Sequence, residues 1–450
     1  MLSPFFSSGL LLAVAFLFTR AELSAQAVAP SPSPVIGAVT PSITDSAALS
    51  KLSALGKEPD WKKLEVFAET MTKTEFEAAW SEIYSEANAM PPPFQIRDTA
   101  ISIPTGQAKE STATVPFLAT GEKSKNTFKA SWRRARDLPA QGKRPPLSDL
   151  VIAIDPGHIG GAYATMEERM LSFKAGESIR EGDLSLLTAK ILKERLMALG
   201  AVATLVRETA EPVTKKRPED LQTEALAVLT EAGFPKPAPT YAGLTGDAKL
   251  LTVQWQSEKL FYRVSEIHAR AERVNQQIKP DLVLCLHFNA EAWGDATAPQ
   301  FSPKNDLHIL VNGCYAPVEL QQQDVRFQML QRLLSRTHEE EIPLATAIAA
   351  TMSQTTGLPA YVYTTPNARH AGKNPYVYAR NLLANRLYEC PVVYLEPFVM
   401  NHEETYRRLL CEHFLGRTLI GGKLTTSAIE DYINGIVKGL LAYYQTNRPS

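Results

Sequence analysis

One apolar run that stops abruptly in a Pro-Gly turn constrains the fold of this chain more than any other stretch. Residues 151–155 are mostly apolar and rich in β-branched side chains, which predicts a buried strand, and Pro156 and Gly157 cannot continue it. His158 follows this turn directly. Because α/β folds usually build their sites at the carboxyl edge of the sheet, this ending places His158 where a functional residue is expected.

Two further apolar runs end in polar residues. Residues 284–286 lead into His287, and residues 392–395 lead into Glu396. Glu181 lies between the first two endings, where an amphipathic helix opens. The three strand endings and the acidic residue between them predict one site at one edge of a sheet.

The order of strands and helices after residue 150 predicts the fold class. A strand at 151–155, a helix that ends at Gly200 and a strand at 202–206 form a βαβ unit with a parallel pair of strands. Further strands are expected at 281–288, 307–312 and 391–396, and further helices at 344–352 and 429–444. We therefore predict a three-layer α/β/α domain at residues 150–446, with a central mixed, mostly parallel sheet.

An insertion is expected within this domain at residues 208–262. Glycine and proline residues break its helical runs, and two helices with apolar faces are expected. The first would carry Leu221, Leu226, Val228 and Leu229, and the second would carry Leu250, Leu251, Val253 and Trp255. Since the neighbouring elements point towards the site edge, the insertion is either a lid or gate, on which a protein activator would act, or a packing elaboration.

The chain opens with the features of an export signal. Residues 9–18 are apolar but too few to span a bilayer, which needs about 20, and residues 25–27 supply an Ala-Gln-Ala cleavage site. We therefore expect a signal peptide at 1–27, a location in the periplasm or the extracellular cell wall, and no membrane span after cleavage. A buried N-terminal helix is the alternative. Residues 28–44, rich in Pro and Ser, are expected to be a solvated linker.

Residues 45–122 are predicted to form a small α+β module. Apolar residues at helical spacing between 60 and 87 indicate two helices, and the turn at 72–75 can cap the second one. Short strands are expected at 94–104 and 113–118. A wall-targeting or spacer role and a packing appendage are both open.

Charge and cysteine content exclude several classes of protein. The chain has 47 basic and 48 acidic residues, so no overall field favours nucleic acid or a membrane surface. Residues 123–149 form a basic segment with Phe128 and Trp132 interleaved, which is either a solvated linker or a site for an anionic polymer. The four cysteines lack CxxC spacing, which indicates neither a zinc ribbon nor a dense disulfide scaffold; they are Cys285, Cys314, Cys390 and Cys411.

Five short motifs follow one another in the sequence. They are Asp155-Pro156-Gly157-His158, Arg180-Glu181 before a Leu-rich helix, Arg270 with Asn275, Leu-His-Phe-Asn-Ala at 286–290, and Leu-Glu-Pro-Phe-Val-Met-Asn at 395–401. In this order they resemble the zinc-dependent N-acetylmuramoyl-L-alanine amidases of the DPGH or amidase 3 type. The resemblance covers residues 150–446. It implies that His158, Glu181 and His287 bind zinc and that Glu396 is the catalytic acid/base. The long loop between the first two ligands, Pro397 and the insertion depart from the family.

The residues support this chemistry without the family. Amide hydrolysis needs an activated water, a stabiliser for the oxyanion and a proton for the leaving nitrogen. Three protein ligands on zinc leave one coordination position open, and zinc lowers the pKa of a bound water to about 7. Glu396, kept off the metal, would accept a proton and return it to the amine.

Each site residue also has a purely structural interpretation. Glu181 fits a capping box with Ser178, His158 can be a satisfied turn histidine, and His287 can be a hydrogen-bonded core residue. An unpaired buried carboxylate is costly, which makes Glu396 harder to explain in this way. His308, on its own strand, is the histidine to examine as an additional ligand.

The function that these observations predict is hydrolysis of the amide between the lactyl group of N-acetylmuramic acid and L-alanine in peptidoglycan. Zinc is the only cofactor expected, and the role would be cell-wall remodelling or cell separation. Two alternatives stay open. One is a zinc peptidase that acts on another wall amide, and the other is a non-catalytic wall-binding or regulatory homologue.

Overall fold

The computed structural model describes residues 48–86, 92–106, 111–294 and 298–449. The predicted signal peptide and the Pro/Ser-rich linker lie outside these residues. Within the described part of the chain, no helix is long and apolar enough to cross a membrane.

A seven-stranded mixed sheet forms the centre of the molecule, in the order β10-β11-β9-β12-β8-β4-β7. In chain order the strands are β4 (Val151–Pro156), β7 (Val202–Leu205), β8 (Leu282–Leu286), β9 (Leu307–Val311), β10 (Arg369–His370), β11 (Val377–Ala379) and β12 (Val392–Pro397). The four strands β7, β4, β8 and β12 are parallel, whereas β9 runs antiparallel to β12. Every residue of β8 and β9 is buried, as expected for strands covered on both faces.

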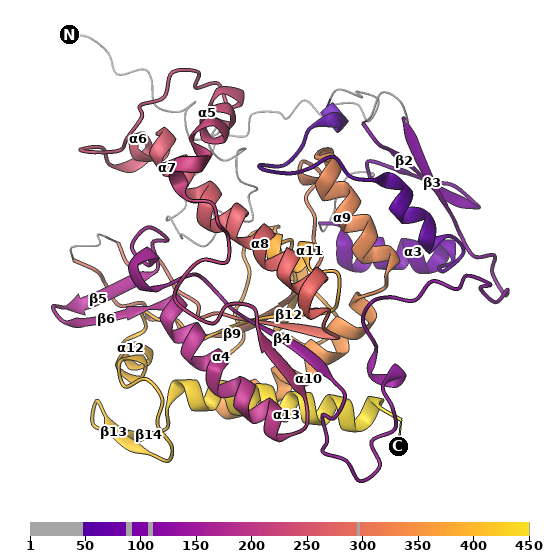
Figure 1. Ribbon diagram of the computed structural model, residues 1–450. Helices are drawn as coiled ribbons and strands as arrows, with labels where there is room; N and C mark the ends of the chain where they lie inside the picture. The colour runs from indigo at the N-terminus through magenta and orange to yellow at the C-terminus, as the bar shows by residue number, and fades with distance from the viewer. Residues whose placement is uncertain (1–47, 87–91, 107–110, 295–297, 450) are drawn as a thin grey trace.

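Helices cover both faces of the sheet, which confirms the predicted three-layer fold (Figure 1). One face packs against α4 (Glu181–Ala198), α10 (His338–Thr356) and α13 (Ala428–Asn447). Alternate residues of the central strands point to each side: Ile152 and Leu284 join the core beneath these helices, and Ala153 and Val283 join the opposite core. The second core is covered by α8 (Glu266–Glu272) and α11 (Leu383–Leu387).

The small N-terminal module has the predicted α+β composition. It contains η2 (Trp61–Phe67), α3 (Lys73–Ala79), η3 (Trp80–Tyr84) and a three-stranded antiparallel sheet of β1 (Gln95–Ile96), β2 (Ala100–Pro104) and β3 (Thr112–Pro116). The predicted cap is confirmed: the Thr72 hydroxyl accepts from the Glu75 N–H, and the Glu75 carboxylate accepts from the Thr72 N–H. The module packs on α9 (Gln323–Leu334), where the Trp61 and Phe327 rings meet edge to face at 5.5 Å.

The basic segment at 123–149 is exposed over much of its length, but some of its residues anchor it to the large domain. Trp132 is 5% exposed and packs in the core beside β8. The Arg133 Nε donates to Asp281 Oδ1 at 2.9 Å, and its Nη2 donates to Asp281 Oδ2 at 2.7 Å. The tryptophan and the arginine of this segment thus both find partners on the large domain.

The insertion forms a lobe of short helices that projects from the body of the molecule (Figure 1). Its elements are η6 (Pro218–Leu221), α5 (Gln222–Glu231), α6 (Gly246–Leu250), α7 (Val253–Lys259) and η7 (Leu260–Ser265), and η7 runs on into α8. The prediction of one helix through 250–255 is wrong, because Thr252 separates α6 from α7 and caps α7 by accepting from the Trp255 N–H. Leu229 is buried as expected, whereas Leu226 is exposed.

Candidate metal centre

Adjacent parallel strands bring the two predicted histidines to one edge of the sheet. Pro156 of β4 pairs with Leu286 of β8, and the Gly157 N–H donates to the Leu286 carbonyl at 2.9 Å. His158 and His287 therefore leave neighbouring strand ends together. Their imidazole ring centroids lie 5.1 Å apart.

Gly157 is required for this approach. A Cβ at this position would lie 2.2 Å from Cε1 of His287, far inside any real contact. His158 itself has a left-handed backbone with φ +57°, an unusual conformation for a residue with a side chain. The Pro-Gly turn thus allows the two imidazoles to approach each other, and the structure around it maintains a strained histidine.

Glu181 is the first residue of α4, and its side chain is 2% exposed between the two histidines. Its Oε2 lies 3.1 Å from His158 Nε2, and its Oε1 lies 3.0 Å from His287 Nδ1. The alternative of a capping box with Ser178 is wrong. Ser178 belongs to a strand, and the N-cap residue of α4 is Arg180, which makes no side-chain cap bond.

The three residues offer ligand atoms that all lie within 4.8 Å of one another, and among the described residues they form the only such group of His, Cys, Asp or Glu. Two imidazole nitrogens and one carboxylate oxygen are a donor set that zinc accepts in open sites. The cluster therefore fits a zinc ion with three protein ligands and one free position. Burial would raise the pKa of the Glu181 carboxyl, but His158 and His287 hold it well below its usual range.

Two residues that the sequence did not indicate as site residues contact the cluster: Glu167 contacts His158, and Arg169 contacts Glu181. Glu167 Oε1 lies 3.5 Å from His158 Nδ1, and the same carboxylate accepts from the Ile159 N–H at 2.9 Å and the Gly160 N–H at 3.0 Å. Arg169 Nε lies 3.3 Å from Glu181 Oε2. The sequence signal for them was a run of charged residues in the long loop after His158.

That long loop holds a β-hairpin, which explains how Arg169 reaches Glu181. Strands β5 (Met170–Lys174) and β6 (Glu177–Arg180) pair antiparallel, with a register shift between Ser172 and Lys174. The hairpin returns the chain to its starting point, where the Glu181 N–H donates to the Arg169 carbonyl at 3.1 Å. The long loop after His158 is thus an ordered element that positions Glu181.

Arg270 and Asn275, the third motif, brace the strand ends. Arg270 Nη1 donates to Asp155 Oδ1 at 2.9 Å and to the Pro156 carbonyl at 2.8 Å, while its Nη2 donates to the His158 carbonyl at 2.8 Å. Asn275 Nδ2 donates to the Leu387 carbonyl at 2.9 Å, in the segment that precedes β12. Both residues act on the backbone that carries the site.

Glu396 stands at the end of β12, next to β8. The His287 N–H donates to the Leu395 carbonyl at 3.0 Å, and the Tyr394 ring, which shares a strand face with Glu396, stacks on the His287 ring at 4.4 Å. The protein's own groups raise the pKa of Glu396 to about 8, through burial and the charge of Glu181. Glu396 is therefore a neighbour of the cluster without being part of it.

His308 lies opposite Glu396 in the β9–β12 register, outside the cluster. Burial and the charge of Arg380 lower its pKa to about 3, which keeps the imidazole neutral. Its ring contacts those of Tyr361 and Tyr363 at centroid distances of 4.7 and 5.4 Å. His308 is thus a core neighbour of Glu396 within an aromatic group.

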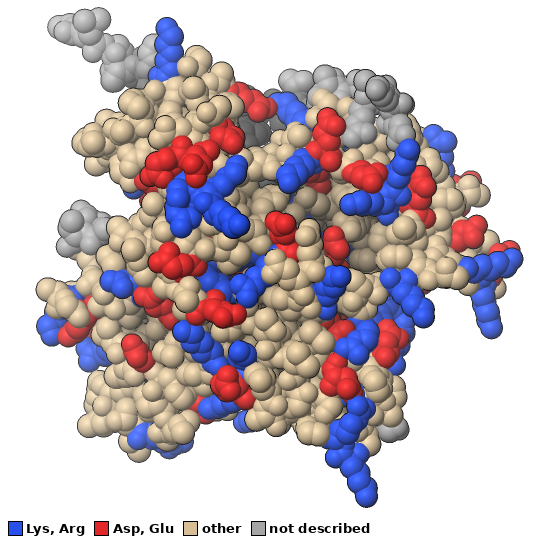
Figure 2. Space-filling view, in the orientation of Figure 1, with Lys and Arg blue, Asp and Glu red and all other residues tan. Residues whose placement is uncertain are grey.

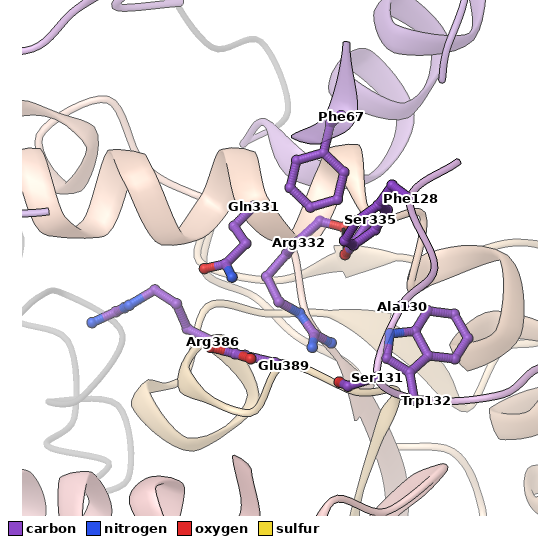
Figure 3. Close-up of a pocket in the computed structure, with 10 residues that line it drawn as sticks. All are labelled: Phe67, Phe128, Ala130, Ser131, Trp132, Gln331, Arg332, Ser335, Arg386 and Glu389. Atoms are coloured by element: carbon purple, nitrogen blue, oxygen red, sulfur yellow. Dashed lines mark hydrogen bonds between the residues drawn. The ribbon is translucent and has the colours of Figure 1, made fainter. Parts of the chain in front are cut away.

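A small cavity of about 60 Å³ lies at the other edge of the sheet (Figure 3). Arg332 in its lining donates to the Cys390 carbonyl, just before β12 begins, whereas Glu396 is near the end of that strand. None of the four predicted site residues lines this cavity. The other lining residues are Phe67, Phe128, Ala130, Ser131, Trp132, Gln331, Ser335, Arg386 and Glu389.

The fold and the cluster together define an α/β protein with a candidate His-Glu-His metal site. No protein-family model and no curated protein matches the chain. Solved structures do, including the N-acetylmuramyl-L-alanine amidase Ami1 of Mycobacterium abscessus (14% identity, 66% of this chain and 99% of that one, TM-score 0.34). Another is the amidase AmiC2 of Nostoc punctiforme (15%, 66% and 99%, TM-score 0.34). A third is the CwlD amidase of Clostridioides difficile in complex with the GerS lipoprotein (14%, 66% and 100%, TM-score 0.36).

Proposed function

We propose that the protein is an exported zinc amidohydrolase that cleaves the amide between the lactyl group of N-acetylmuramic acid and L-alanine in peptidoglycan. The observation that supports this most is the cluster of the half-buried His158 and His287 around the buried Glu181, with a separate carboxyl, Glu396, at the next strand end. The identity of the bond comes from the resemblance of the five motifs to the amidases. The chemistry of a metal-assisted amide hydrolysis comes from the donor set.

In this proposal His158, Glu181 and His287 hold the ion, and Glu396 stays off it. Bound zinc supplies a water of lowered pKa and polarises a carbonyl. Glu396 accepts the proton of the attacking water and gives it to the leaving nitrogen, so that the amine departs neutral. The raised pKa of the Glu396 carboxyl suits it to both steps, accepting a proton from the water and donating it to the nitrogen.

The support behind the ligands has a function in the same proposal. Glu167 fixes the ring of His158, and Arg169 fixes the carboxylate of Glu181. Such outer partners set the orientation and basicity of metal ligands.

The test is mass spectrometry of purified peptidoglycan digested with the full-length mature protein, with and without a chelator. An amidase releases intact stem peptides that begin with a free L-alanine amine, and the chelator stops the release. Fragments cut within the stem or the crosslink would instead indicate the zinc peptidase. Binding to the wall without any release would indicate the non-catalytic homologue.

A further inference from the structure

Successive side chains of the segment 167–169 contact two different parts of the molecule, the candidate metal cluster and the insertion. Glu167 and Arg169 face the cluster, where they contact His158 and Glu181. Glu168, between them, faces the insertion: its Oε1 lies 3.3 Å from Lys249 Nζ and its Oε2 lies 3.4 Å from Lys259 Nζ. One short segment thus connects the candidate metal ligands to two helices of the insertion.

Lys259 is an unusual residue to find at such a junction. Its side chain is 6% exposed, and its ammonium lies 4.5 Å from the Trp255 ring centroid and 5.2 Å from that of Tyr262. A lysine is almost never this deeply buried unless a carboxylate pairs with it. The Glu168 carboxylate, which Lys249 shares, and the two aromatic rings together surround the Lys259 Nζ.

The insertion also packs directly on the residues that follow His158. Ile159 is fully buried in an apolar cluster with Leu221 and Phe261, both from the insertion. The Tyr163 ring lies 5.7 Å from the Phe261 ring. The whole stretch from 159 to 169 is therefore held from one side by the insertion while it holds His158 and Glu181 on the other.

We propose that the insertion is a brace for the metal site and that Lys259, acting through Glu168, is its positioning residue. This inference rests on the proposed zinc site. Without the Lys259 contact, segment 167–169 loses its buried anchor and keeps only the more exposed contact with Lys249, so that Glu167 and Arg169 hold the two ligands less firmly in one geometry. Metal affinity then falls although every ligand is still present, because outer partners of metal ligands typically contribute 10–100-fold in affinity.

The experiment measures the zinc dissociation constant of the full chain by competition with a chromophoric chelator. Lys259→Met keeps the aliphatic length against Trp255, and Glu168→Gln removes the partner charge. Each is expected to weaken zinc binding about 10-fold, the lower end for an outer partner. Lys259→Arg is expected to stay near the wild type, since it keeps a cation within reach of Glu168.

Two controls separate positioning from general damage. Lys216→Met removes another lysine of the insertion, whose Nζ lies 3.7 Å from Glu224 with both side chains well exposed, and should leave zinc affinity unchanged. The double variant Glu168→Gln with Lys259→Met should bind zinc about as weakly as each single variant, since both substitutions remove the same contact. At saturating zinc, the variants should regain the wild-type rate of wall hydrolysis.

The outcomes distinguish this inference from the function on which it rests. A wild-type protein that binds no zinc overturns the proposed function itself. A wild type that binds zinc, with Glu168→Gln and Lys259→Met binding it equally well, overturns the brace alone. Should Lys259→Met fail to fold by circular dichroism, Glu168→Gln decides the question in the same way.

Discussion

Glu396 is the residue on which the proposed chemistry depends, because it lies beside the three-residue cluster without belonging to it. Glu396→Gln keeps the size of the side chain but removes its capacity to accept a proton. We expect stoichiometric zinc by metal analysis and a loss of about 10²–10⁴-fold in wall hydrolysis. A variant that keeps more than about a tenth of the rate would assign the proton transfer to another group.

Gly157 gives a second prediction at the scale of one residue. In Gly157→Ala, the new methyl group collides with the imidazole of His287, which must turn away from its partners. Overpacking of this kind typically costs about 1–3 kcal/mol. Calorimetry should show a lower melting temperature, and metal analysis should show less bound zinc. Full zinc occupancy in this variant would mean that His287 is not a ligand.

The sequence predicted which residues of the candidate site lie close together, but it did not predict the residues that contact them from the long loop. His158 and His287 follow their strands and Glu396 lies near the end of its own strand. Because parallel strands end at one edge of a sheet, it was predictable that the three residues lie near one another. The contacts of Glu167 and Arg169 were not predictable, since Glu167 meets His158 through an irregular turn and Arg169 meets Glu181 only through the β5–β6 hairpin. The register shift between Ser172 and Lys174 breaks the alternation by which a strand is usually recognised.

Among the elements, α9 was not predicted because its buried side is partly polar. Gln323, Asp324, Arg326 and Arg332 are all buried along it, which dilutes the apolar stripe that marks a helix in a sequence. Arg332 forms an ion pair with Glu341, and both side chains are almost fully buried. The pair joins α9 and α10 at the edge of the sheet opposite the cluster.

This pair gives a prediction about stability. Arg332→Met leaves the Glu341 carboxylate buried without its main cation, and we expect a loss of about 3–5 kcal/mol in the free energy of unfolding. Arg407→Met, which breaks the exposed pair with Glu403, should cost less than about 1 kcal/mol. Urea unfolding followed by fluorescence measures both. Equal effects would show that Arg332 does not anchor the helix pair.

Replacing residues 212–258 by a short Gly/Ser linker tests the insertion as an element. The change removes Lys249 and Trp255 together with α5, α6 and most of α7. If the insertion braces the site, the shortened chain should bind zinc more weakly than the parent in chelator competition. A lid or gate, the alternative drawn from the sequence, predicts that zinc stays bound and that wall hydrolysis rises. The activator remains a prediction tied to that alternative.

For the molecule as a whole, the layers and the sheet were predictable because hydrophobic patterning repeats along most of the long elements. Two contacts between distant segments were not predictable, because such contacts leave no periodic signal in the sequence. They are the packing of the basic segment on the large domain and the packing of the N-terminal module on α9. Figure 2 shows acidic and basic side chains interspersed over the visible face, as expected from a net charge of −1. On this face, no broad field of one sign is present to attract a strongly charged partner.

The central claim is that His158, Glu181 and His287 hold one zinc ion and that Glu396 does not. Anomalous diffraction from crystals of the zinc-loaded protein, collected on both sides of the zinc absorption edge, tests it most directly. We expect one peak about 2.0–2.2 Å from a ligand atom of each of the three residues, with the Glu396 carboxylate outside bonding distance. No peak between these residues, or a peak bonded to Glu396 or His308, would contradict it.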